Sequence, residues 1–195
     1  HVRWYGLMYV LGFLASYYLV RRQIREYKYP QLAKHFENLN LVLILGVVLG
    51  GRLGYVFFYN FSYYIAHPLE IPAIWSGGMS FHGACLTLLI GGWIFCRRNK
   101  LDYWKTADIY IATLPIGLGL GRIGNFINGE LYGRATDLPW GMVFPGGGSS
   151  PRHPSQLYES FLEGFLLFVI LWSVRKKPWQ KKRYWPHGSI LALFL

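Results

Sequence analysis

Five runs of mostly apolar residues, each close to the length that crosses a lipid bilayer, constrain this chain more than any other feature. A helix needs about 20 residues to cross roughly 30 Å of hydrocarbon. Hydrophobic residues make up 53% of the chain and charged residues only 15%, against about 25% charged in ordinary soluble domains. We therefore expect an all-α, polytopic membrane helix bundle rather than a large soluble core. The expected spans are residues 4–20, 39–59, 81–96, 107–121 and 156–173.

A sixth apolar run covers residues 188–195 and stops after eight residues. Eight helical residues rise about 12 Å, which is too little to cross a bilayer. We therefore expect residues 1–195 to form a single integral membrane domain that belongs to a longer chain. A polar segment, residues 122–152, separates the fourth and fifth spans.

The chain has a net charge of +11, and most of its Lys and Arg residues lie in alternate loops between the expected spans. Membrane proteins keep Lys and Arg in their cytoplasmic loops, so the loops after the odd-numbered spans are predicted to face the cytoplasm. The N-terminus and residues 122–152 are then predicted to face outward, and no nucleic-acid partner is needed to explain the charge. The clustered basic residues are Arg21, Arg22, Arg25, Lys28 and Lys34, then Arg97, Arg98, Lys100 and Lys105, then Arg175, Lys176, Lys177, Lys181, Lys182 and Arg183.

The polar segment opens with Gly-Arg-Ile-Gly-Asn-Phe-Ile-Asn-Gly-Glu-Leu-Tyr-Gly at residues 121–133. An arginine, two amides and a carboxylate at the end of an apolar run are costly unless they meet a polar ligand or each other. These four side chains, Arg122, Asn125, Asn128 and Glu130, are therefore candidate site residues.

A Gly-x-Gly-x-x-Gly pattern at residues 119–124 overlaps the start of this segment. A dinucleotide site would require a preceding strand and a βαβ unit, so nucleotide binding is disfavoured. The glycines are better explained by an unwound or tightly packed helix end that exposes backbone N–H groups.

Three more polar residues lie near expected span ends. His82, with small neighbours, is either a structural histidine or a proton acceptor near neutral pH. Glu159 lies one turn inside the fifth span, so it needs a partner, for which an outward-side arginine is the natural candidate; the alternative is helix capping with a structural ion pair. Arg52 either snorkels to the interface or faces an interior cavity. No metal-ligand spacing is present, so we expect neither metal nor cofactor.

The outward groups together favour a site for an anionic headgroup, because arginine matches phosphate by bidentate geometry and constant charge. Residues 121–133 also closely resemble the signature of the bacterial prolipoprotein diacylglyceryl transferase family. Three shorter motifs also resemble this family, at residues 4–9, 77–83 and 152–159, so the resemblance covers essentially the whole chain. It implies a seven-span enzyme of the cytoplasmic membrane with an outward N-terminus.

The resemblance also implies the reaction and most of the site. The family transfers the diacylglyceryl group of phosphatidylglycerol to the lipobox cysteine thiol of a prolipoprotein signal peptide, forming a thioether and releasing glycerol phosphate. Arg122 matches the family's essential arginine, and His82 its conserved histidine; a second essential arginine is expected after Leu195. Arg3 stands where some relatives have histidine. We assign Arg122 and His82 to catalysis, and to substrate binding Tyr5, Arg52, Asn125, Asn128, Glu130, Gly133, Arg152, His153 and Glu159.

Two other classes of function stay open from the residues alone. A membrane transporter of an anionic lipid or solute would use a similar basic and polar pocket, but it needs access from both faces. The polar groups here gather on one predicted side, which favours the transferase. A structural membrane subunit would have no use for the costly cluster at residues 122–133.

Overall fold

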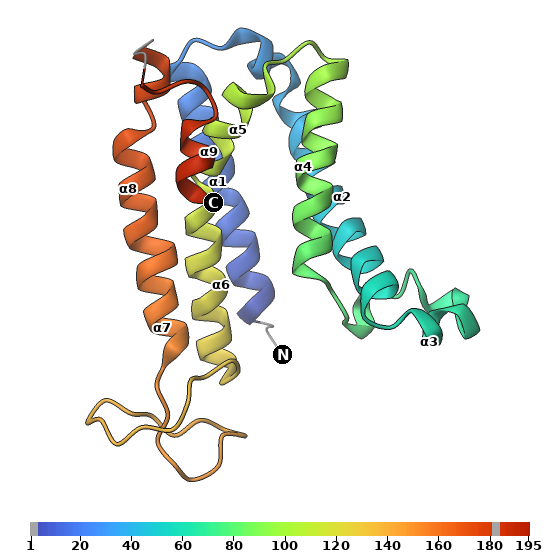
Figure 1. The fold of residues 1–195 in the computed structure, drawn as a ribbon, viewed down its shortest axis with the longest axis vertical. Helices are drawn as coiled ribbons and strands as arrows, with labels where there is room; N and C mark the ends of the chain where they lie inside the picture. Colours follow the sequence, from blue (N-terminus) through green and yellow to red (C-terminus); the bar gives the residue numbers. More distant parts are fainter. Residues whose placement is uncertain (1–3, 181–183) are drawn as a thin grey trace. The chain divides into compact units, whose positions relative to one another are not determined.

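A computed structural model describes residues 4–180 and 184–195. These residues form helices and loops with two isolated antiparallel bridges and no β-sheet among them (Figure 1). The all-α class is therefore confirmed. The chain divides into two compact units, one from the described parts of His1–Lys28 and Ala107–Leu195, the other from Tyr29–Thr106. Helix α5 (Tyr103–Ile111) contains the second division point.

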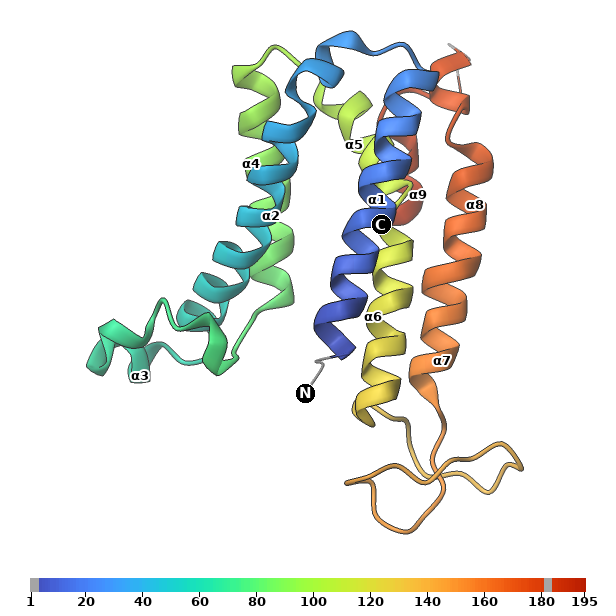
Figure 2. The ribbon, with the colours of Figure 1, turned by 180° about the vertical axis from the view of Figure 1, so that it is seen from behind.

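The first unit is built around helix α6 (Leu114–Asn128). Helix α1 (Trp4–Glu26) packs on it, and so does one unbroken helical stretch made of α7 (Ser155–Glu159), the π-helical segment η3 (Ser160–Leu166) and α8 (Leu167–Val174). Both ribbon views show these helices side by side, with α1 beginning at the end of the unit where α6 ends (Figures 1 and 2).

Helix α6 begins and ends at other residues than the sequence predicted for the fourth span. The expected span 107–121 is interrupted, because α5 ends at Ile111 and α6 begins at Leu114. Pro115 explains this break: its ring would clash with the carbonyl of Ile111 four residues earlier, and it has no N–H to donate. The helix then continues to Asn128 instead of ending at Gly121, so the residues from Arg122 to Asn128 are helical and the polar loop begins at Gly129.

The end of α6 is fixed by a Schellman motif. Gly129 adopts a left-handed conformation with φ of 69°, its N–H donates to Phe126, and the N–H of Glu130 donates to the carbonyl of Asn125 at 3.0 Å. Glycine suits this position because it has no Cβ. The motif therefore places the Glu130 backbone directly beyond the last helical turn.

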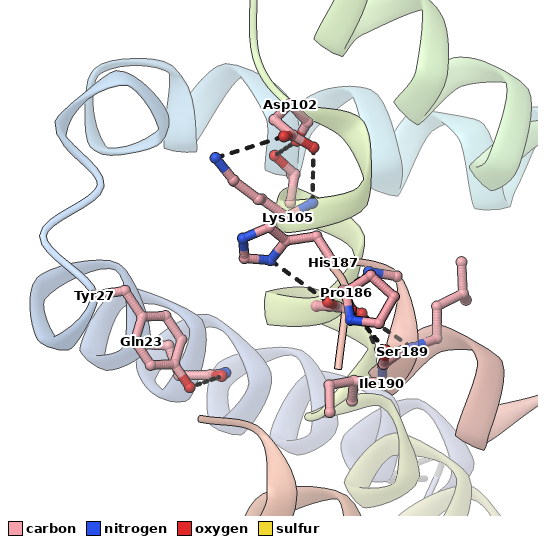
Figure 3. Close-up of polar contacts among 12 residues, drawn as sticks. Gln23, Tyr27, Asp102, Lys105, Pro186, His187, Ser189 and Ile190 are labelled. Atoms are coloured by element: carbon pink, nitrogen blue, oxygen red, sulfur yellow. Dashed lines mark hydrogen bonds and ion pairs between the residues drawn. The ribbon is translucent and has the colours of Figure 1, made fainter. Parts of the chain in front are cut away.

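Helix α9 (Ser189–Phe194), which begins the sixth apolar run, is anchored by Asp108 of α5. The buried Asp108 carboxylate accepts backbone N–H groups from Gly188, Ile190 and Leu191 at 2.7, 3.0 and 3.1 Å. Figure 3 shows Ile190 at this helix start and the hydroxyl of Tyr27, the residue that follows α1, bonded to Gln23. A carboxylate at a helix start satisfies backbone donors that would otherwise lack partners.

The second unit contains helix α2 (Pro30–Phe58) packed on α4 (Phe81–Arg98). The two helices pack closely at Gly46 and Gly50: Thr87 donates to the Gly46 carbonyl at 2.7 Å, and a Cβ on Gly50 would overlap the Thr87 side chain. Short helices connect α2 to α4. They are α3 (Phe61–Ala66), η1 (Pro68–Glu70) and η2 (Ile74–Ser76); a further short helix, η4 (Lys177–Gln180), follows α8 in the first unit.

The helices present many apolar side chains outward. Two of the described helices, Pro30–Phe58 and Ser155–Gln180, are long and apolar enough to cross a membrane. On α1, Leu14 and Tyr18 are 60% and 63% exposed. Exposed apolar surface on this scale is typical of a protein whose solvent is lipid.

Candidate active site

Arg122 and Glu159 form an ion pair between α6 and α7. Arg122 Nε lies 2.7 Å from Glu159 Oε2, and each side chain is 34% exposed. The prediction that the partner of Glu159 is an arginine is confirmed. The contact uses one edge of the guanidinium, which in total offers five N–H donors in a planar fork. Arg122 can therefore keep Glu159 as a partner and still bind an anion through its terminal nitrogens.

The second group is a carboxylate held by two amides. Glu130 Oε1 accepts hydrogen bonds from Asn125 Nδ2 at 3.0 Å and Asn128 Nδ2 at 3.2 Å. Asn125 is buried, whereas Asn128 and Glu130 are exposed. The two asparagines lie three residues apart on α6, which puts them on one helix face. The three predicted residues thus form one cluster at the end of α6.

Gln156 is a member of this cluster that sequence reasoning missed. Its side chain is 1% exposed, and its Nε2 donates to the backbone carbonyl of Glu130 at 2.6 Å. Gln156 lies within the motif at residues 152–159 that resembles the family, but the sequence alone assigned it no role. Gln156 ties the start of α7 to the loop that follows α6.

The loop of residues 129–154 is closed by Gly133, Arg152 and His153. The N–H of Gly133 donates to the carbonyl of His153 at 2.9 Å, and Arg152 exchanges two backbone hydrogen bonds with Met142 at 2.8 and 2.9 Å. A Cβ on Gly133 would lie 2.9 Å from the His153 Cβ, so the close approach requires glycine.

The Arg152 side chain also makes contacts within this loop. Its Nε donates to the Gly147 carbonyl at 2.9 Å, and its guanidinium stacks over Tyr132 with 5.1 Å to the ring centre. His153 Nδ1 lies 3.3 Å from the Tyr158 hydroxyl. The predicted substrate contacts of Arg152 and His153 stay predictions, beside these loop-closing contacts.

Arg52 and His82 belong to the other unit, Tyr29–Thr106. Arg52 is 3% exposed, so of its two predicted placements the structure shows the interior one. Its guanidinium donates to the carbonyls of Ile71, Gly77 and Glu70 at 2.7, 2.6 and 2.8 Å. Arg52 therefore holds the connection between α2 and α4, and binding of substrate by Arg52 stays a prediction.

His82 is exposed in the first turn of α4, behind the cap in which Ser80 Oγ accepts the N–H of Gly83 at 3.2 Å. Tyr5 lies in the first turn of α1, but its side chain is outside the described residues. A shared site of Arg122 with His82 or Tyr5 stays a prediction. Among the described residues, no group of three His, Cys, Asp or Glu side chains is placed to hold a metal ion.

Comparison with known proteins identifies the family. The sequence model of the prolipoprotein diacylglyceryl transferase family matches residues 1–195. The chain belongs to the prolipoprotein diacylglyceryl transferase family. The resemblance of the sequence motifs to this family is thereby confirmed. The chain is a transferase.

Individual relatives agree with the family match. Three of them are each named phosphatidylglycerol–prolipoprotein diacylglyceryl transferase. The protein of Desulfotalea psychrophila is 67% identical, and the match covers 100% of this chain and 71% of the relative. The protein of Geobacter sulfurreducens is 54% identical over 90% of this chain and 68% of the relative. The protein of Legionella pneumophila is 47% identical over 100% of this chain and 73% of the relative. These matches give no support to the transporter or structural-subunit alternatives.

Proposed function

We propose that this chain transfers the diacylglyceryl group of phosphatidylglycerol to the lipobox cysteine of a prolipoprotein signal peptide. The relatives' names give the lipid and the prolipoprotein as substrates. The observation that carries the proposal for the site is the Arg122–Glu159 ion pair, since it holds an arginine at the end of an apolar helix in a fixed orientation.

In this reaction the cysteine sulfur attacks the glycerol carbon that bears the phosphate ester. A C–S bond forms, the C–O bond to the phosphate breaks, and glycerol phosphate leaves with the bonding electrons. The thiol proton passes to a base. The products are the thioether-linked diacylglyceryl cysteine and glycerol phosphate.

Arg122 binds the phosphate and stabilises the charge that gathers on it as the C–O bond breaks. A prepositioned donor in a site of low dielectric constant acts most strongly where charge develops in the transition state. Glu159 holds the Nε edge of Arg122, so the two terminal nitrogens are the fork offered to phosphate oxygens.

The Glu130 cluster orients the headgroup glycerol. Two roles suit a cluster of this kind, orientation of the headgroup or orientation of Arg122. Asn125 and Asn128 donate to Glu130, whereas Arg122 pairs with Glu159. The carboxylate of Glu130 keeps further acceptor capacity for glycerol hydroxyl groups.

The remaining predicted residues take supporting roles. His82 is the proposed base for the thiol, whose unperturbed pKa of about 8.5 keeps it mostly protonated at neutral pH. Tyr5, Arg52, Arg152 and His153 are proposed lipid or loop contacts, and Gly133 permits the loop closure.

The proposed location is the bacterial cytoplasmic membrane, with seven spans in the full-length protein and the site on the outer side. One contact in the first unit supports this topology. Glu26, at the end of α1, pairs with Arg175 at 3.3 Å and with Lys176. Two of the three basic clusters therefore meet at one end of the unit, opposite the end where α6 stops (Figures 1 and 2).

The test uses full-length protein in detergent with phosphatidylglycerol and a lipobox peptide, and follows release of glycerol phosphate. A peptide with the cysteine replaced by alanine is the control. Release that requires the cysteine and disappears in Arg122→Ala supports the proposal. If folded wild-type protein releases none, the transferase proposal fails, and lipid flux in vesicles becomes the assay for the transporter alternative.

A further inference from the structure

Helix α6 and the α7–η3–α8 stretch touch backbone to backbone at Gly119 and Gly164. A Cβ on Gly164 would lie 2.5 Å from the Gly119 Cα, and a Cβ on Gly119 would lie 2.9 Å from the Gly164 Cα. Both distances are shorter than ordinary van der Waals contact, so alanine at either position forces the helices apart. In membranes, small residues at such crossings allow backbones to approach closely.

A side-chain hydrogen bond lies next to this crossing. Ser160 Oγ donates to the backbone carbonyl of Gly119 at 3.0 Å. With the pair of Glu159 and Arg122, this gives two polar ties between the two helical stretches, and the bond from Gln156 to the Glu130 carbonyl adds a third just beyond the end of α6. The ties run in antiparallel order, which fixes the register of one helix against the other.

The π-helical segment is what allows both features to face α6. Glu159 and Gly164 are five residues apart, and on a regular α-helix such residues point about 140° away from each other. In η3 (Ser160–Leu166) the hydrogen bonds span five residues, as in that from the N–H of Leu167 to the Leu162 carbonyl. Residues five apart then return to nearly the same face. Glu159 thus reaches Arg122 while Gly164 touches Gly119.

The partner positions on α6 match this arrangement. Gly119 and Arg122 are three residues apart, so they lie on one face of a regular helix. The contact at Gly119 is therefore one turn from the guanidinium-bearing residue, and any shift at the crossing changes the position of Arg122 relative to Glu159.

We propose that Gly119, Ser160 and Gly164 are positioning residues for Arg122. Their contact, made possible by the π-helical turn, sets the depth and rotation at which Glu159 holds the guanidinium. This inference rests on the proposed role of Arg122 in phosphate binding. None of the three touches the reacting atoms; they act through the Arg122–Glu159 pair.

The first readout is spectroscopic and needs no activity. In ¹⁵N-labelled full-length protein in detergent micelles, the Arg122 Nε–H signal is assigned by its loss in Arg122→Lys. An Nε–H that donates to a carboxylate makes a short, charge-assisted bond, and its proton resonates downfield of exposed arginines. We expect Gly164→Ala to move this signal to the exposed position. Gly117→Ala is the matched control, because a Cβ there meets nothing within 4 Å.

The second readout is kinetic. A displacement of about 1 Å at a site can cost about 100-fold in rate, so we expect Gly164→Ala to lower kcat by about 10- to 100-fold with a smaller change in KM. In a Glu159→Gln background the same substitution should cost at most about twofold, because coupled residues are not additive. A merely structural role would cost the same in both backgrounds.

Ser160→Ala keeps the test decisive if Gly164→Ala does not fold. It removes only the hydroxyl, and Ser160→Thr should restore the signal and the rate. An Arg122 signal that stays in place in folded Ser160→Ala and Gly164→Ala overturns the inference, as does an equal kcat loss in both backgrounds. If wild-type protein is inactive, the proposed function fails instead, while the Nε–H signal still decides the positioning role.

Discussion

Arg122 on α6 and Glu159 at the end of α7 form an ion pair on the Nε side of the guanidinium, with 2.7 Å between Nε and Oε2. This geometry makes Glu159 an orienting group and leaves the Nη edge of Arg122 for an anion. A carboxylate bound across the terminal nitrogens would instead have occupied the fork that suits phosphate.

Replacing Arg122 by lysine should therefore abolish most activity although the charge is kept. An ammonium group is a point charge and cannot hold Glu159 with one edge and a phosphate with the other. We expect glycerol phosphate release to fall about 100- to 1,000-fold, the range for loss of a transition-state donor. The exposed Arg98 on α4 gives the control, since Arg98→Lys should leave the rate unchanged. Near-normal turnover of Arg122→Lys would remove Arg122 from the proposed chemistry.

Gly133→Ala should loosen the loop that follows α6. The new Cβ would lie 2.9 Å from the His153 Cβ and 3.1 Å from the His153 carbonyl oxygen. Overpacking of this kind costs about 1–3 kcal/mol. We expect a lower Tm in detergent and faster amide exchange at residues 133–153, with Gly117→Ala as control. Unchanged exchange would show that the loop absorbs the methyl group.

Arg52→Lys should free the connection between α2 and α4. Arg52 donates to the carbonyls of Glu70, Ile71 and Gly77 at once, and a lysine lacks the planar fork to do so. We expect faster hydrogen exchange at residues 70–78, measured by mass spectrometry, and little change along α4. If residues 70–78 keep their protection, the guanidinium is not what holds this connection.

Glu26 should make stability depend on pH in the acid range. The hydrogen bond from Lys176, and then the charge of Arg175, hold the pKa of Glu26 below its ordinary value of 4.5. The folded state thus favours the ionised form, so the stabilisation is complete above about pH 4.5 and is lost as the pH falls through the lower folded pKa.

The test compares Glu26→Gln with wild type in thermal melts in detergent. We expect the variant to have the lower Tm at pH 7 and the difference to shrink as the pH is lowered from 4.5. The exposed Asp137 supplies a control, Asp137→Asn, of the same charge change. A difference in Tm that does not vary with pH would exclude this linkage.

Asp108→Ala should release the start of α9. Three backbone N–H groups, those of Gly188, Ile190 and Leu191, would lose their acceptor. Loss of a helix cap costs about 0.5–2 kcal/mol. We expect faster amide exchange at residues 188–191 and a lower denaturation midpoint, and Asp108→Asn should lie between the variant and wild type. Retained protection in Asp108→Ala would mean that α9 is held by its apolar contacts alone.

The sequence alone determined the helical class, the approximate helices, the basic clusters and the family, because each of these is recorded in the order of residues along the chain. An apolar run long enough to cross a bilayer must satisfy its backbone hydrogen bonds internally, which in a single run means a helix. The need of Glu159 for an arginine followed from the cost of a lone carboxylate in apolar surroundings.

Only the tertiary structure decided which groups meet. The glycines before Arg122 predicted an unwound or a tightly packed helix end, and the structure shows tight packing, since Gly119 closes against Gly164 while α6 continues to the Schellman motif after Asn128. The motif at residues 152–159 contains Gln156 but did not show its partner, and the π-helical turn had no sequence signal. The periodicity of a helix shows which residues share a face, but which two faces touch depends on contacts between residues far apart in the chain.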